Sequence, residues 1–281
     1  MAAPKTSKAT PNPASRSPID IEQTDCTPFF QGYSWTIKDQ SLLVCYLARL
    51  VLGQSLAVAR VLHALDTDLP GSPAETAIEA AIKELRSPGT DKNRRWRRDG
   101  WIFQMIAWLA AWNRGTSQDR IRAPQIRQGE HGIDGLLIQL VDGGPGVRGV
   151  TICEQKATEN PRQKIQQQVW PDLVDYESGA RDNQLVSEVT ALLEKEDAAT
   201  ATELAAKIHW ESQRWYRVAV TVDENQDGES LKKLFAGYDN AVMGTDERRH
   251  GEVLHIQDLR GWMDQICQLI TAELKTLKAR K

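Results

Sequence analysis

The chain has 281 residues and a formal net charge of −3, and hydrophobic residues make up 41% of it and charged residues 26%. These values fit a globular protein of one large domain or two modest ones, and four scattered cysteines without a CxxC pair argue against a disulfide framework and for a reducing cytoplasm. The sequence has neither the ~20 consecutive apolar residues of a membrane span nor an N-terminal signal core, so we expect a cytoplasmic protein without membrane contact. Because the net charge is negative, any binding of nucleic acid would have to come from local basic patches.

The N-terminal third is expected to hold a leader followed by helices. Residues 1–33 contain five prolines among Ser, Thr and Lys, and this composition predicts a flexible leader. Residues 34–93 predict a helical region, with helices at about 42–52 and 54–65 and a third that runs from a capping box at 72–75 to about 86.

Residues 94–281 are expected to form a second unit that ends in a long helix. A basic loop leads into 101–112, where eleven of twelve residues are apolar, and this indicates a buried helix with Gln104 as its one polar residue. Later segments alternate between extended and helical patterns. Strands are predicted at about 122–127, 134–141, 149–157, 215–222 and 253–256, and helices at about 162–170, 184–195, 201–210, 231–236 and 259–277.

Two of the predicted strands carry a group of charged residues. Glu154 and Lys156 are two positions apart, so they share one face of a strand. Asp134 begins the preceding strand, and a turn centred on Pro145 would place Asp134 opposite Lys156 and diagonal to Glu154. The sequence therefore predicts that two carboxylates and an ammonium meet on one patch.

This combination of residue types suits phosphodiester hydrolysis. Carboxylate oxygens are ligands for Mg²⁺, which keeps several waters and binds phosphate oxygens as well. Lys156 would orient the attacking water or stabilise the anionic transition state, whereas a role as general base would need a strongly lowered pKa. The alternative is a structural cross-strand ion pair on a solvated face of the sheet.

The segment Gly132–Ile138, followed by a hairpin and then Glu154-Gln155-Lys156, resembles the motif of the PD-(D/E)XK phosphodiesterase superfamily. The resemblance covers roughly residues 95–222 and includes the order of elements: an apolar helix, the Asp strand, the ExK strand, a Gln-rich helix and another strand. Ile133 stands where the motif has Pro. The resemblance implies a restriction-endonuclease-like α/β fold, with a mixed central sheet flanked by helices, and a Mg²⁺ cofactor, with Mn²⁺ as the alternative. The segment 98–104 also resembles effector nucleases of bacterial antiphage defence systems.

Further residues are candidates for the same site. Gln104 would face the metal from the buried helix, or else bond to neighbouring backbone; Glu130 would be an additional metal ligand, or else a loop carboxylate. Phosphate contacts are predicted for the basic cluster and for two residues of the Gln-rich helix, although solvated charge would also explain them. These residues are Arg94, Arg95, Arg97, Arg98, Lys164 and Gln168.

The sequence thus predicts a metal-dependent endonuclease that cuts DNA, with Asp134 and Glu154 holding the metal and Lys156 positioning the nucleophile. The resemblance implies a defence effector working with a partner helicase or sensor, and self-association remains an open alternative. An RNase on the same chemistry and a catalytically silent nucleic-acid-binding or scaffolding subunit are the competing hypotheses.

Overall fold

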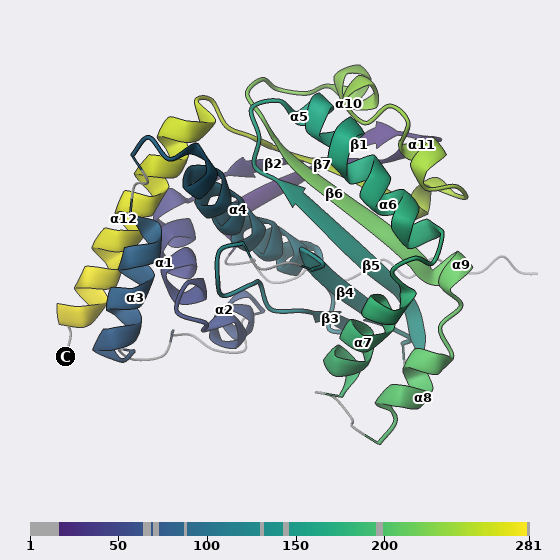
Figure 1. The fold of residues 1–281 in the computed structure, drawn as a ribbon, viewed down its shortest axis with the longest axis horizontal. Helices are drawn as coiled ribbons and strands as arrows, with labels where there is room; N and C mark the ends of the chain where they lie inside the picture. The colour runs from purple at the N-terminus through teal and green to yellow at the C-terminus, as the bar shows by residue number, and fades with distance from the viewer. Residues whose placement is uncertain are drawn as a thin grey trace, which may run out of the picture.

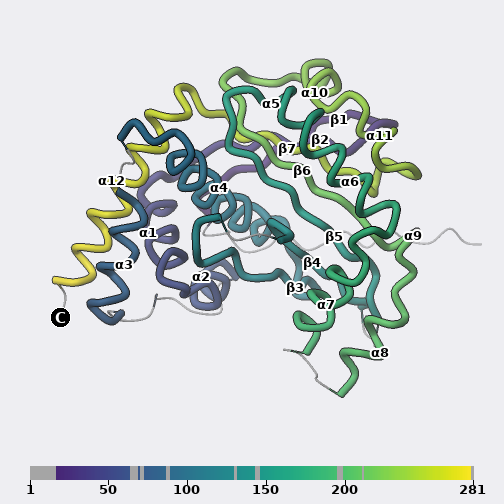
Figure 2. The backbone as a smooth tube through the Cα atoms, in the orientation of Figure 1, coloured from purple at the N-terminus to yellow at the C-terminus, as the bar shows by residue number. Residues whose placement is uncertain are grey.

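The computed structural model describes residues 17–63, 69, 73–86, 89–129, 132–142, 146–194 and 199–279 (Figures 1 and 2). A seven-stranded sheet forms the centre, in the order β1-β2-β7-β6-β5-β4-β3. The strands are β1 (Ile19–Cys26), β2 (Phe30–Ile37), β3 (Asp119–Ile121), β4 (Gly135–Leu140), β5 (Val147–Lys156), β6 (Arg214–Val222) and β7 (Arg249–His255).

The sheet is mixed, and its middle is parallel. β2, β7, β6 and β5 run parallel, whereas β1 and the pair β4–β3 are antiparallel to their neighbours. Parallel strands are covered on both faces, which explains why β6 reads as a nearly continuous buried run instead of alternating. The prediction of an α/β protein with a mixed sheet flanked by helices is confirmed at this level.

Each face of the sheet has its own hydrophobic core and its own layer of helices (Figure 1). One layer consists of α1 (Gln40–Leu50), α2 (Ser55–Leu62), α3 (Glu75–Leu85), α4 (Lys92–Arg114) and α12 (Leu259–Ala279). The helical elements between β5 and β7 are α5 (Pro161–Lys164), the π-helix η1 (Ile165–Val169), α6 (Trp170–Glu177), α7 (Asp182–Leu193), α8 (Ala201–Ala206), α9 (Trp210–Gln213), α10 (Gly228–Leu234), α11 (Tyr238–Ala241) and the 3₁₀ turn η2 (Asp246–Arg248). From the second group, η1, α6, α7, α8, α10 and α11 supply the other core.

The beginning of the chain differs from the prediction. Residues 17–33, expected in a flexible leader, include β1 and the start of β2, and the chain enters its core with a β-hairpin and not with helices. The expected boundary at 33/34 falls inside β2, which pairs with β7 from the other end of the chain. Proline density misled the prediction because Pro18 precedes β1 and Pro28 lies in the hairpin turn, so neither removes a ladder hydrogen bond.

Two further predictions are wrong in detail. The basic segment 94–98 is helical and forms the first turns of α4, which begins where the Asp91 carboxylate accepts a hydrogen bond from the backbone N–H of Arg94. The hairpin register pairs Gly135 with Cys153, two residues away from the pairing expected for a turn centred on Pro145. None of the helices in the described residues has the length and hydrophobicity to cross a membrane.

Candidate active site

Asp134 lies directly before β4, and its carboxylate is held by three donors. Gln104 of α4 donates from Nε2 to Oδ1 at 2.8 Å, and the backbone N–H of Gln155 donates to Oδ2 at 3.0 Å. Lys156 lies 3.5 Å from the same Oδ2. Of the two alternatives for Gln104, the structure therefore shows the one in which this helix residue faces the site.

Glu154 and Lys156 lie on β5 and contact each other. The Lys156 ammonium is 3.0 Å from Oε2 of Glu154. Glu154 is only 4% exposed, so the pair does not lie on a solvated sheet face. The two carboxylates and the ammonium are brought together as predicted. The register differs, however: because Gly135 pairs with Cys153, Asp134 lies opposite Glu154 and not opposite Lys156.

The charges in this group perturb one another. Burial raises the pKa of Glu154, and Lys156 opposes this effect only in part. Burial lowers the pKa of Lys156, but the Glu154 and Asp134 carboxylates outweigh it, so the net shift is upward. Lys156 is therefore an ammonium at neutral pH, and the general-base role that would need a lowered pKa is not supported by its surroundings.

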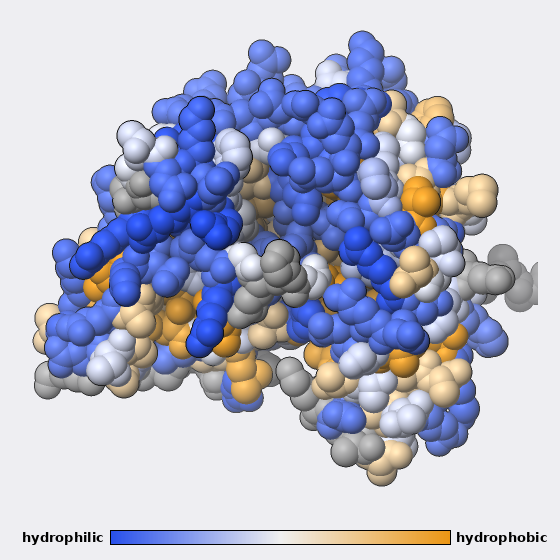
Figure 3. Space-filling model, viewed as in Figure 1, coloured by the Kyte–Doolittle hydropathy of each residue, from blue (hydrophilic) through white to orange (hydrophobic). Residues whose placement is uncertain are grey.

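A cleft of about 420 Å³ opens over Asp134 and Lys156, between α4 on one side and α5 with η1 on the other, and the buried Glu154 is not part of its lining. Its lining includes Asp134, Lys156 and Gln104 and the two predicted phosphate contacts, Lys164 and Gln168. The space-filling view shows a largely hydrophilic surface with a recess over this part of the molecule (Figure 3). The other cleft residues are Trp96, Gly100, Gln155, Ala157, Thr158, Glu159, Asn160, Gln163, Gln167 and Arg260. Of these, Thr158, Glu159, Asn160 and Arg260 lie outside every motif that the sequence indicated.

The predicted basic cluster divides into two parts. Arg94 and Arg97 are exposed at the start of α4, and the half-buried Arg95 donates to the carbonyl of Gly89. Arg98 is 1% exposed and pairs with Asp99 and Asp264, so it is part of the interior and not of a nucleic-acid surface. A local sequence window cannot distinguish these cases, because Asp264 comes from the C-terminal helix.

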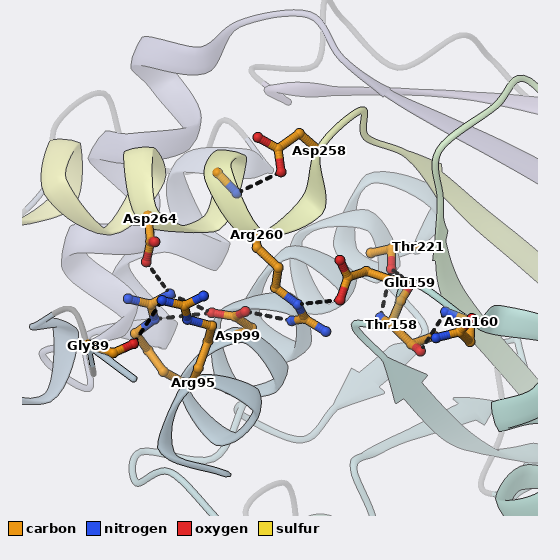
Figure 4. Close-up of polar contacts among 12 residues, drawn as sticks. Gly89, Arg95, Asp99, Thr158, Glu159, Asn160, Thr221, Asp258, Arg260 and Asp264 are labelled. Carbon is orange, nitrogen blue, oxygen red and sulfur yellow. Dashed lines mark hydrogen bonds and ion pairs between the residues drawn. The ribbon is translucent and has the colours of Figure 1, made fainter. Parts of the chain in front are cut away.

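Arg260 of α12 is a residue of the cleft that no sequence motif indicated. It donates to Asp99 at 2.6 Å and to Glu159 at 3.0 Å, and so connects α12, α4 and the loop after β5 (Figure 4). In the same loop, Thr158 exchanges hydrogen bonds with Thr221 of β6. These contacts hold the loop after β5 in place at the rim of the cleft.

The donor set fits a magnesium site better than a site of the zinc type. In the described residues no group of three or more His, Cys, Asp and Glu side chains is arranged to hold a metal, whereas Mg²⁺ needs only one or two carboxylates because it keeps its waters. Oε1 of Gln104 and Oε1 of Gln155 are buried oxygens without a hydrogen-bond partner, and both side chains line the cleft. Glu130, the further predicted ligand, lies outside the described residues.

Comparison with known proteins gives no relative: no family model matches, and neither a curated protein nor a solved structure shows significant similarity to this chain.

Proposed function

We propose that the protein is a Mg²⁺-dependent nuclease that hydrolyses phosphodiester bonds in DNA. The observation that carries the proposal is the convergence of two carboxylates on Lys156, which lies within 3.5 Å of both. Asp134 and Lys156 line an open cleft, and the buried Glu154 contacts Lys156 from beneath the lining. A purely structural ion pair would not need the cleft, nor a glutamine on α4 that orients Asp134.

The order of elements supports a restriction-endonuclease-like core. The buried helix α4, the hairpin β4–β5, the helical segment α5–η1–α6 and the parallel strand β6 follow one another as the resemblance to the PD-(D/E)XK superfamily implies. In this arrangement Asp134 directly precedes β4, and Glu154 and Lys156 lie on the adjacent strand β5.

Each residue of the group has a distinct part in the proposed reaction. Asp134 and Glu154 would hold Mg²⁺, or Mn²⁺, which supplies an activated water and neutralises charge on the phosphate. Gln104 fixes the orientation of the Asp134 carboxylate. The Lys156 ammonium would stabilise the negative charge that develops on the phosphoryl oxygens, since a fixed charge in a partly enclosed site acts strongly there.

A cleavage assay tests the proposal. Plasmid, single-stranded DNA and RNA are incubated with Mg²⁺, Mn²⁺ or EDTA and with wild type, Asp134→Asn, Glu154→Gln or Lys156→Met. We expect metal-dependent cleavage of DNA and a loss of roughly 100-fold or more in each variant. The control is Lys207→Met, since Lys207 is exposed and pairs only locally with Glu203.

Three outcomes would contradict the proposal. Undiminished cleavage by folded Glu154→Gln and Lys156→Met would remove the site assignment, and metal-independent binding without cleavage would favour the silent subunit. Preferential cutting of RNA would identify the RNase alternative.

A wider role as a defence effector beside a helicase or sensor rests on the resemblance of residues 98–104. Two of these residues, Arg98 and Asp99, form the buried ion pair in the first turns of α4.

A further inference from the structure

One face of α4 forms a wall of the cleft. Trp96, Gly100 and Gln104 all line it, and their spacing of four residues places them above one another on the same side of the helix. Gln104 is at the inner end, where it holds Asp134. Trp96 is at the other end, 53% exposed, and makes no aromatic or cation–π contact within the described residues. The helix thus presents a free indole about two turns from the candidate active site.

Gly100 leaves a gap between these two side chains. A Cβ atom built on Gly100 would meet nothing within 4 Å, so the absence of a side chain leaves open space and not a tight helix contact. Gly within a helix costs about 1 kcal/mol relative to Ala. The structure has room for a side chain at this position, so packing does not require the glycine. Its cost to helix stability is explained if the space above Gly100 receives a ligand.

The opposite wall is made of side-chain amides. Asn160, Gln163, Gln167 and Gln168 line it, together with Lys164. The helix widens here into a π turn, in which the N–H of Trp170 bonds to the carbonyl of Ile165, and such turns are frequent at functional sites. Amides donate and accept, so they can bond to the edge of a nucleobase as well as to a phosphate.

The charges of the cleft do not favour a continuous duplex. Lys156 and Arg260 are both held in ion pairs, and Lys164 is the cleft cation without an ion pair among the described residues. Tight binding of duplex DNA rests mainly on many phosphate contacts, whereas binding of single strands adds stacking of bases on aromatic rings. In a duplex the faces of each base are covered by its neighbours, so an exposed indole can stack only on an unpaired or terminal base.

We propose that the cleft takes an unpaired nucleotide of a DNA strand, with its base stacked on Trp96 above Gly100 and its edge facing the amides of the α5–η1 wall. This inference rests on the proposed function and names its substrate class. It predicts that single-stranded DNA, or DNA with a single-stranded segment, binds in preference to blunt duplex.

The test measures binding without cleavage. The full-length protein in EDTA is titrated into a labelled single-stranded DNA 20-mer, the blunt duplex of the same sequence and the matching RNA, and fluorescence anisotropy gives each Kd. We expect single-stranded DNA to bind at least tenfold more tightly than duplex. Trp96→Ala should weaken single-strand binding roughly tenfold, since stacking of one base on an aromatic ring contributes about 1–3 kcal/mol. Trp96→Phe should retain most of the affinity.

One control and one further cleft variant separate stacking from folding. Phe29→Ala removes another exposed aromatic ring, outside the cleft, and should leave every Kd unchanged. Gly100→Leu should weaken single-strand binding at least tenfold because its side chain would enter the gap. The Gly100→Leu variant and both tryptophan variants should retain the circular dichroism of wild type.

The outcomes distinguish this inference from the proposed function. Equal binding of duplex and single strand, or no loss in Trp96→Ala, would overturn the inference while cleavage dependent on Asp134 would keep the function. Trp96-dependent binding of single-stranded DNA without cleavage in Mg²⁺ would keep the inference and remove the nuclease. Preferential binding of RNA would overturn the assignment to DNA.

Discussion

The side-chain amide of Gln104 donates a hydrogen bond from Nε2 to Oδ1 of Asp134 over 2.8 Å, and this bond joins the middle of α4 to the residue that leads into β4. Residues thirty positions apart are thereby placed together at the edge of the cleft. Oε1 of the same amide is buried without a partner. The orientation of Asp134 thus depends on α4, which packs in the layer of α1, α2, α3 and α12, and not on the strand that Asp134 precedes.

Gln104→Leu is expected to weaken Mg²⁺ binding and cleavage about 10- to 100-fold, which is the usual effect of removing a partner that orients a metal ligand. Isothermal titration with Mg²⁺ and the plasmid assay measure the two effects. Gln265→Leu, on an exposed position of α12, is the matched control. Unchanged Mg²⁺ affinity in a folded Gln104→Leu protein would show that Asp134 needs no such support.

The buried carboxylate of Asp99 is expected to be important for stability. It is fully buried and accepts from both Arg98 and Arg260. Asp99→Asn would remove the buried counter-ion that Arg98 and Arg260 share, leaving only the more exposed Asp264 and Glu159 as their partners. It should lower the free energy of unfolding by about 3 kcal/mol. Urea denaturation measures this.

The matched control for Asp99 is Glu203→Gln, which breaks an ion pair between side chains that are 65% and 68% exposed. That change should cost less than about 1 kcal/mol. Similar losses in the two variants would contradict the prediction that the network between α4 and α12 stabilises the fold.

Two glycines are expected to respond in opposite directions to alanine. At Gly251 of β7 a Cβ would lie 2.8 Å from the ring of Phe30 and 3.0 Å from that of Phe235, so Gly251→Ala should destabilise by about 1–3 kcal/mol. At Gly100 the Cβ would have free space, and Gly100→Ala should stabilise α4 by up to about 1 kcal/mol. Thermal unfolding of both variants tests the pair, and a rise in Tm for Gly251→Ala would be inconsistent with the packing described.

His250 is expected to make stability depend on pH. Burial and the nearby Arg114 lower the pKa of His250 to about 4, whereas in the unfolded chain it titrates near 6.5. Between these pH values the unfolded state binds one more proton at this histidine than the folded state does. The stability that the neutral, buried His250 contributes is therefore fully present above pH 6.5 and is lost as the pH falls toward 4. The free energy of unfolding should change by up to about 1.4 kcal/mol per pH unit in this window. His250→Gln should be less sensitive than wild type over this window in urea titrations, and equal slopes would refute the assignment.

The sequence by itself determined much of the local structure. The buried run at 101–112, the strands at 134–141, 149–157 and 215–222 and the long C-terminal helix are present in the structure at nearly the expected positions, because periodicity and apolar runs directly reflect burial. The short motif also identified Asp134, Glu154 and Lys156, since alternation along β5 alone places the last two on one face.

Tertiary structure alone decided the rest. The register of β4 against β5, the pairing of β2 with β7 and the burial of Arg98 against Asp264 depend on contacts between residues distant in sequence, and no local propensity encodes them. The same holds for the cleft, whose walls come from α4, α5 and η1 and whose rim is held by Arg260. The identity of the charged residues is local information, but their positions relative to Gln104 and Trp96 follow from how the helices pack on the sheet.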